Sequence, residues 1–186
     1  MKKALLIILL LVTYTNYSQN FPVITLNDKS SLKLNQLYVN AEISGNYATV
    51  TYDMTFYNGL NRVLEGELAF PLSQGQSVSH FAMDLNGKLR SAVVVEKELG
   101  RVAYENTIKQ RIDPALLEQT QGNNYKARVY PIPAKGYKRI VITYEQNLLI
   151  NDKNYQFEIP FGFKDSVNSF KIEIKSNNIN SQPKVN

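Results

Sequence analysis

The chain of 186 residues contains no cysteine and one histidine, and these absences exclude several classes of function. Without thiols the protein has no disulfide framework and no lipid anchor on an N-terminal cysteine. A lone His80 cannot build the usual ligand sets of a zinc site. A Ser-His-Asp triad also needs orienting partners that His80, beside Phe81, lacks. We therefore interpret His80 as a surface or half-buried strand residue.

Other catalytic signatures are also missing from the sequence. It has no Gly-x-Ser-x-Gly elbow and no glycine-rich phosphate loop. Asp113 and Glu118 are not accompanied by the spaced oxygen ligands of a calcium loop. We therefore expect no catalytic residue, no cofactor and no metal. Glu65 and Glu67 share one face of a predicted strand, and a carboxylate-based glycan hydrolase is the enzyme alternative that they leave open.

The N-terminus has the features of a secretory signal peptide. Lys2 and Lys3 precede an apolar run, Ala4 to Val12, which is too short to span a bilayer as a helix. Ser18 stands at a plausible cleavage position, so we predict a signal peptide over residues 1–18 rather than a membrane anchor. The protein is then exported to the periplasm, the cell surface or the medium, with no membrane insertion after cleavage.

Alternation of apolar and polar residues dominates the rest of the chain. Apolar residues recur at every second position from Leu37 to Ile43 and from Ala48 to Phe56, and Ser44-Gly45-Asn46 lies between these runs. This pattern predicts a hairpin with one buried and one wet face. Asn86-Gly87 indicates a second hairpin. Further strands are expected around residues 64–70, 125–130, 140–144, 155–160 and 169–175.

One segment has a helical pattern, Glu96 to Arg111. Leu99, Val102 and Ala103 lie along one stripe, and Asp113-Pro114 would end the helix. Many short strands with regularly spaced turns predict a mainly β fold, an antiparallel β-sandwich with this one short helix around residues 96–111.

The predicted organisation follows from these elements. Residues 19–34 form an N-terminal lead-in, residues 35–150 the sandwich domain, and residues 151–175 further strands that extend it. Residues 176–186 are polar and read as a linker or tail. We therefore expect the chain to be the front part of a longer secreted or surface protein.

Several short blocks follow one another in a fixed order, and they are Tyr52 to Asn58, Leu64-Glu65, Phe70-Pro71-Leu72, Glu96 to Glu105, Leu116-Leu117-Glu118, Asn124-Tyr125, Ile132-Pro133 and Tyr144 to Leu148. This ordered set resembles the VIT domain, the module shared by vault poly(ADP-ribose) polymerase and the heavy chains of inter-alpha-trypsin inhibitor. The resemblance implies a β-rich domain without catalytic activity. VIT domains commonly precede a metal-binding von Willebrand A domain, but the spacing of Asp165 to Ser169 does not fit that metal loop.

The leading functional hypothesis is a non-catalytic, extracytoplasmic protein-interaction module. Exposed tyrosines suit such a surface, and the candidates are Tyr57, Tyr130 and Tyr137. The expected partner is a protein or a downstream domain of the same protein, and not nucleic acid. The alternative is a structural spacer that supports a downstream domain. An anionic glycan is a further possible partner of the cations Lys126, Arg128, Lys135, Lys138 and Arg139, although these also suit the solvated face of two strands.

Overall fold

The computed structural model describes residues 21–96, 116–151, 154–159, 161–162, 166–177 and 184, and this part of the chain consists of strands and their connections. The strands are β1 (Val23–Leu26), β2 (Lys33–Ser44), β3 (Tyr47–Tyr57), β4 (Leu64–Pro71), β5 (Gln76–Leu85), β6 (Lys88–Glu96), β7 (Leu116–Thr120), β8 (Asn124–Ile132), β9 (Tyr137–Asn147), β10 (Leu149–Asn151), β11 (Asn154–Gln156) and β12 (Ser169–Asn177). The predicted mainly β fold is confirmed.

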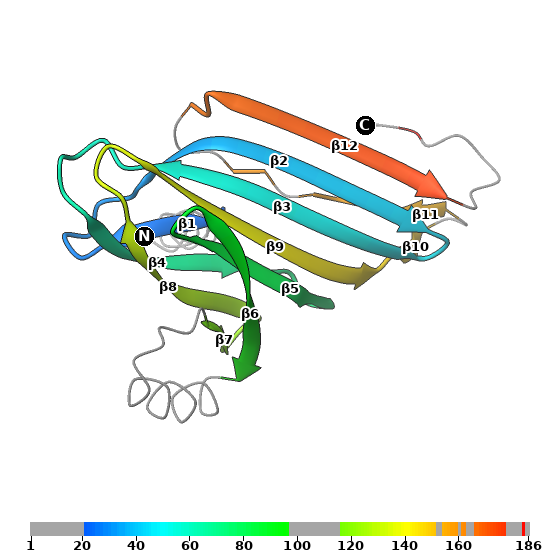
Figure 1. Cartoon of the computed structure of the whole chain (residues 1–186). Coiled ribbons are helices and arrows are strands. Elements are labelled where there is room, and N and C mark those ends of the chain that lie inside the picture. Colours follow the sequence, from blue (N-terminus) through cyan, green and yellow to red (C-terminus); the bar gives the residue numbers. More distant parts are fainter. Residues whose placement is uncertain are drawn as a thin grey trace, which may run out of the picture.

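Ten of the strands form one sheet that folds over on itself. Their order is β1-β4-β8-β7-β6-β5-β9-β3-β2-β12, while β10 and β11 pair separately. In Figure 1, β12, β2, β3 and β9 lie above β1, β4 and β8, and β6 descends at the corner. Most pairs are antiparallel, but β6 with β7 and β12 with β2 run parallel. The expected sandwich is therefore one mixed sheet closed over its own apolar face.

The core lies between the two layers. Alternate residues of β3, such as Val50, Met54 and Phe56, are fully buried and share one cluster with Leu68 of β4 and Val129 of β8. Rings link the layers directly, because Tyr52 on β3 and Phe70 on β4 pack edge to face with centroids 5.6 Å apart. Full burial of each large apolar side chain contributes about 1.5–3 kcal/mol, so the sandwich needs no disulfide.

Both predicted hairpins are present. β2 pairs with β3 through the turn at Gly45, with a register shift between Leu34 and Gln36. β5 pairs with β6 through Asn86 and Gly87, whose φ angles are 56° and 79°. Positive φ at both central positions defines the turn type that Asn-Gly favours. The sequence predicted these turns because their chemistry is local.

The remaining predicted elements either lie outside the described residues or have different bounds in the structure. Glu96, the first residue of the predicted helix, belongs to β6, and residues 97–111 lie outside the described residues, as do the predicted signal peptide and Asp113. Ser176 and Asn177, assigned to the tail, end β12 instead. β11 (Asn154–Gln156) overlaps the strand expected over residues 155–160 only at Tyr155 and Gln156. Within the described residues, no helix has the length and apolar character needed to cross a membrane.

Candidate interaction surface

Asn58 holds the connection that follows β3 against the turn between β8 and β9. Its side chain is fully buried, and its amide nitrogen donates to the carbonyls of Arg62 and Pro133, each at 2.8 Å. Its side-chain oxygen accepts from the Leu60 backbone N–H at 2.9 Å. Its own backbone N–H donates to the Gly136 carbonyl at 2.9 Å. One asparagine therefore satisfies backbone groups of two loops.

Lys135 fastens the same two loops from the other side. Its backbone N–H donates to the Leu60 carbonyl at 2.9 Å, and its side-chain ammonium donates to the Gly59 carbonyl at 2.5 Å. Lys135 has a φ of 49°, a left-handed conformation that is uncommon for a residue other than glycine. The two connections thus form one cross-linked unit at this end of the sandwich.

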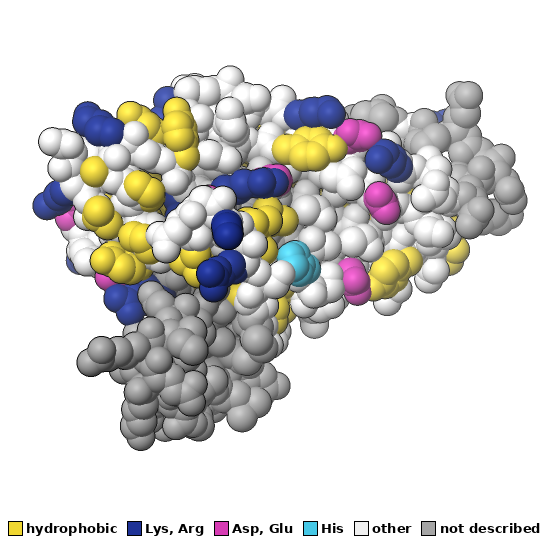
Figure 2. Space-filling view, in the orientation of Figure 1, with side chains coloured by type: hydrophobic (Ala, Val, Ile, Leu, Met, Phe, Trp, Pro, Cys, Tyr) yellow, Lys and Arg dark blue, Asp and Glu magenta, His cyan; other side chains and the backbone are white. Residues whose placement is uncertain are grey.

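Exposed apolar side chains lie on this unit. Tyr57 and Tyr137 face each other in the register of β3 and β9, with ring centroids 5.0 Å apart. Tyr137 is 56% exposed, Leu60 47% and Val63 54%. We call Tyr57, Leu60, Val63 and Tyr137 the loop-end patch. Figure 2 shows hydrophobic side chains gathered at the end of the molecule where Figure 1 places the β3–β4 and β8–β9 connections.

The third candidate tyrosine lies elsewhere. Tyr130 belongs to β8, in the other layer, and the guanidinium of Arg128 lies 6.0 Å from its ring centroid. All three tyrosines were predicted on equal grounds as exposed aromatic residues. The structure brings Tyr57 and Tyr137 together across β3 and β9, whereas Tyr130 lies on a strand of the other layer. Leu60 and Val63 were missed, because nothing in their local sequence distinguishes an exposed loop residue from a core residue.

Glu65 and Glu67 are engaged in ion pairs across β4 and β8. Glu65 accepts from Arg128 at 2.7 and 3.0 Å, and Glu67 accepts from Lys126 at 2.6 Å. The hydrogen bond from Arg128 lowers the pKa of Glu65. A glycosidase acid needs a raised pKa so that it carries a proton at neutral pH. The environment of Glu65 therefore opposes the proton-donor role in such a hydrolase, but it is compatible with the role of the ionised carboxylate.

The five cations proposed as contacts for an anionic glycan do not form one open basic face. Lys126 and Arg128 neutralise the two glutamates, and Arg139 forms two hydrogen bonds, of 2.8 and 2.6 Å, with Asp53. Lys138 is only 2% exposed, and its ammonium donates to the carbonyls of Asp84 at 2.5 Å and Pro131 at 3.0 Å. The expectation that Lys138 lies on a solvated face was wrong, because its side chain is buried and its ammonium donates to backbone carbonyls.

The remaining candidate residues are dispersed. His80 is exposed on β5, where the register with β9 shifts, as the prediction of a surface strand residue states. Glu118 lies on β7 opposite Lys126. Asp165 is outside the described residues, whereas Asn168 donates to the Asn35 side chain at 2.7 Å and so fastens the entry of β12 to β2. Within the described residues, no three His, Cys, Asp or Glu side chains gather as metal ligands.

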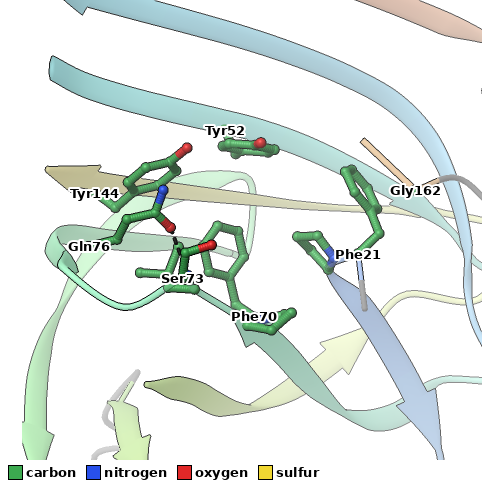
Figure 3. Close-up of a pocket in the computed structure, with 10 residues that line it drawn as sticks. Phe21, Tyr52, Phe70, Ser73, Gln76, Tyr144 and Gly162 are labelled. Atoms are coloured by element: carbon green, nitrogen blue, oxygen red, sulfur yellow. Dashed lines mark hydrogen bonds between the residues drawn. The ribbon is translucent and has the colours of Figure 1, made fainter. Parts of the chain in front are cut away.

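A small cavity of about 120 Å³ opens between the layers (Figure 3). Aromatic rings form its walls, including Tyr52, Phe70 and Tyr144. The side-chain amide oxygen of Gln76, which lines the cavity, accepts from the Ser73 backbone N–H at 2.9 Å. Burial raises the pKa of Tyr144 to about 12, so this phenol stays neutral and does not act as a base at physiological pH.

The model of the vault protein inter-alpha-trypsin domain, VIT, matches residues 34–144, more than half of the chain. The chain belongs to the VIT domain family. This agrees with the resemblance carried by its ordered sequence blocks.

No curated protein matches the chain. Among solved structures, it is similar to a mutant M1 zinc metallopeptidase from Deinococcus radiodurans bound to a Tyr-Ser-Ala substrate, with 12% identity and a TM-score of 0.38. That match covers 67% of this chain and 22% of the peptidase chain. A TM-score of this size supports no argument about shared fold or chemistry.

Proposed function

We propose that this chain is a non-catalytic, extracytoplasmic protein-interaction module of VIT type, and that the loop-end patch is its contact surface. Membership of the VIT family is the observation that carries the proposal. The basic and apolar pattern of residues 1–18 supports export to the periplasm, the surface or the medium. The polar composition of residues 178–186 supports a role as the front part of a longer protein.

The composition of the loop-end patch suits binding to a protein. Tyr137 and Tyr57 combine a large apolar ring with one hydroxyl, and aromatic side chains are enriched at protein interfaces. Leu60 and Val63 add purely apolar area, and both are about half exposed. Arg62 and Lys135 belong to the same two loops and lie in exposed positions. The matching partner therefore has an apolar centre and an acidic rim.

The hydrogen bonds beneath the patch support the same proposal. Asn58 and Lys135 fix the backbone of both loops before any partner arrives. Binding then orders few additional residues, which reduces the entropy cost of association.

The test compares capture of partners from envelope extract by wild-type chain and by two variants. The patch variant combines Leu60→Ser with Tyr137→Ser. The control is Tyr130→Ser, which removes an exposed tyrosine from the other layer. We expect the patch variant to lose a partner that wild type and control both retain. Capture that is undiminished in the patch variant contradicts the proposal and favours the spacer role.

The hydrolase alternative has its own test. Replacing both acids, Glu65→Gln with Glu67→Gln, removes the carboxylates and leaves the shape of the side chains. The proposal expects wild type and this variant to show equal and negligible hydrolysis of glycans. Hydrolysis by wild type that the variant lacks would establish the enzyme instead.

A further inference from the structure

β12 ends the ten-stranded sheet, and among the described residues its outer edge has no strand partner. Its residues pair with β2 in one unbroken register from Ser169 to Asn177 and include no proline or glycine. A long, regular edge strand is a ready template for another strand, because its backbone N–H and carbonyl groups on that side are unpaired in a regular ladder.

The opposite edge of the sheet is protected. β1 has only four residues, and the chain turns back directly after it. Leu32 donates its backbone N–H to the Ile24 carbonyl at 2.8 Å, and Leu26 donates to the Ser30 carbonyl at 2.8 Å. This return occupies groups that another strand would need. The fold thus blocks one edge and leaves the other long and regular.

The inward face of β12 is apolar like that of β2, but the second layer covers it only in part. Phe170, Ile172 and Ile174 are 46%, 38% and 51% exposed, whereas their register partners on β2 are at most 2% exposed. Phe170 packs edge to face with Phe161, with ring centroids 5.3 Å apart. In Figure 1, β12 runs along the rim of the upper layer. A row of apolar side chains therefore continues to the edge of the sheet.

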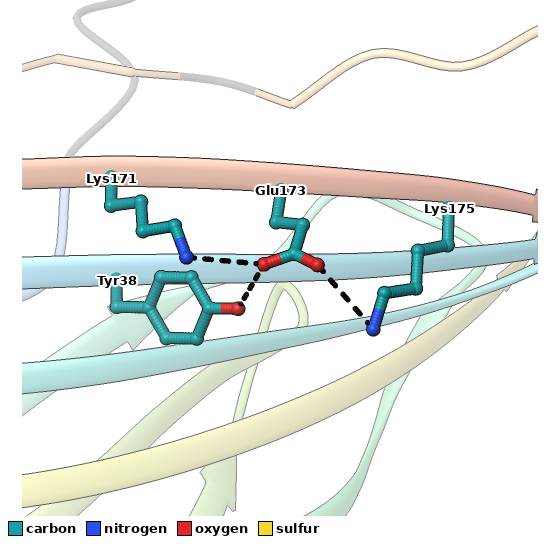
Figure 4. A network of polar contacts seen from close by, with 4 residues as sticks. All are labelled: Tyr38, Lys171, Glu173 and Lys175. Atoms are coloured by element: carbon teal, nitrogen blue, oxygen red, sulfur yellow. Dashed lines mark hydrogen bonds and ion pairs between the residues drawn. The ribbon is translucent and has the colours of Figure 1, made fainter.

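The outward face of β12 carries charges of alternating sign. Lys171, Glu173 and Lys175 follow one another at every second position (Figure 4). Glu173 accepts from Tyr38 at 2.8 Å and from Lys171 at 3.2 Å, and Lys175 lies 3.4 Å from its other oxygen. A strand paired with this edge must place opposite charges against this pattern.

We propose that a second copy of this chain pairs with the free edge, β12 antiparallel to β12, with Ile172 on the two-fold axis. In this register Lys171 faces Glu173 of the second copy, and Glu173 faces its Lys171. Phe170 faces Ile174 of the second copy, and Ile172 faces Ile172. In such an isologous contact each pair away from the axis occurs twice. The apolar rows meet on one face and the opposite charges on the other.

Neighbouring registers fit less well. Centring the pair on Lys171 or on Glu173 sets like charges directly opposite each other, which is destabilising. Centring it on Ile174 pairs Glu173 with Lys175 but leaves Phe170 without an apolar counterpart. The strand is therefore most complementary to itself in the register about Ile172.

Single cysteines test this register without background, because the chain has none of its own. In the proposed dimer the two copies of Ile172→Cys lie directly opposite, at a Cα separation of roughly 4.5–5.5 Å that permits a disulfide. The two copies of the control, Ile174→Cys, lie four residues apart along the strands, roughly 13 Å, and should stay unlinked. We expect mild oxidation to give covalent dimers of Ile172→Cys only.

Charge reversals test the partner by a second route, with dissociation measured by analytical ultracentrifugation. Lys171→Glu and Glu173→Lys each create two like-charge pairs and should raise the dimer Kd about tenfold or more. Their combination restores opposite charges and should return the Kd towards wild type. The control is Lys175→Glu, which faces Ser169 of the second copy and should leave the dimer intact. Circular dichroism verifies that each variant is folded.

Two results would overturn the proposal. One is a wild-type chain that stays monomeric at every concentration up to its solubility limit. That result would mean that a second copy does not pair with β12. The other is a dimer that crosslinks through Ile174→Cys as readily as through Ile172→Cys, or whose Kd is unchanged by the charge reversals. All variants share one N-terminus, so the comparison holds whether or not residues 1–18 are present.

Discussion

The side-chain amide of Asn58 donates to the backbone carbonyl of Pro133 across 2.8 Å, although 75 residues separate them in the chain. This contact joins the connection after β3 to the turn before β9. The two loops are therefore distant in the sequence and adjacent in the fold. Their union gives the loop-end patch a fixed backbone, so its disruption should affect both stability and binding.

Asn58→Ala should lower the free energy of unfolding by about 2 kcal/mol or more. It removes the donors to Arg62 and Pro133 and the acceptor for Leu60, and it leaves part-buried backbone groups without these partners. Urea unfolding measures the change. Asn61→Ala, in an exposed position of the same loop, is the control and should be nearly neutral. Equal stability of the two variants would contradict the role given to Asn58.

Lys138→Met should cost about 2–3 kcal/mol of folding stability. Methionine keeps most of the apolar stem but loses the ammonium that donates to the carbonyls of Asp84 and Pro131. Lys135→Met, an exposed lysine with a hydrogen bond to Gly59, is the matched control and should cost less. Thermal or urea unfolding of both variants gives the comparison. A stabilised Lys138→Met variant would contradict this, because it would show that the desolvation cost of the buried ammonium exceeds the stabilisation by its hydrogen bonds.

Gly66→Ala should weaken the attachment of β1 by about 1–3 kcal/mol. A Cβ at Gly66 would meet the Ile24 side chain at 2.7 Å and the Thr25 carbonyl at 2.8 Å, so β1 must shift. Gly59→Ala is the control, because a Cβ there meets only the Tyr57 ring at an ordinary 3.7 Å. Amide exchange of residues 23–26 should rise in the first variant alone. Unchanged exchange in both would mean that β1 absorbs the methyl group without separating from β4.

The contribution of Glu173 to stability should fall as the solution is acidified. Hydrogen bonds from Tyr38, then Lys171 and Lys175, lower the pKa of Glu173 from 4.5 to about 2. Because the folded pKa lies below the ordinary value, folding favours the ionised carboxylate. The stabilisation is present in full above pH 4.5 and is lost as the pH falls towards 2.

This pH dependence is measured by amide exchange in β12 of wild type and Glu173→Gln. Wild type should show the greater protection above pH 4.5, and the difference should shrink as the pH falls towards 2. Glu42→Gln, on the adjacent strand and opposite Lys175 in register, is the control for loss of a carboxylate. A difference that grows on acidification would contradict the assignment.

Local patterns predicted the strands but not how distant segments meet. The alternation from Leu37 to Ile43 predicted β2 because burial on one face has a period of two. The parallel pairing of β12 with β2 was not predictable, since it depends on a connection that carries no pairing signal. Lys138 resembled any exposed strand lysine, and its burial depends on a carbonyl 54 residues away. The loop-end patch was half found, because Tyr57 and Tyr137 were proposed singly and their contact is tertiary.

Footprinting of the chain in complex with its captured partner tests the central claim most directly. Hydroxyl-radical labelling reports the exposure of each side chain, and Tyr137, Leu60 and Val63 are about half exposed in the free chain. The account predicts that the partner protects these residues and leaves Tyr130, on the other layer, as reactive as before. Protection of Tyr130 with undiminished labelling of Tyr137 and Leu60 would contradict it.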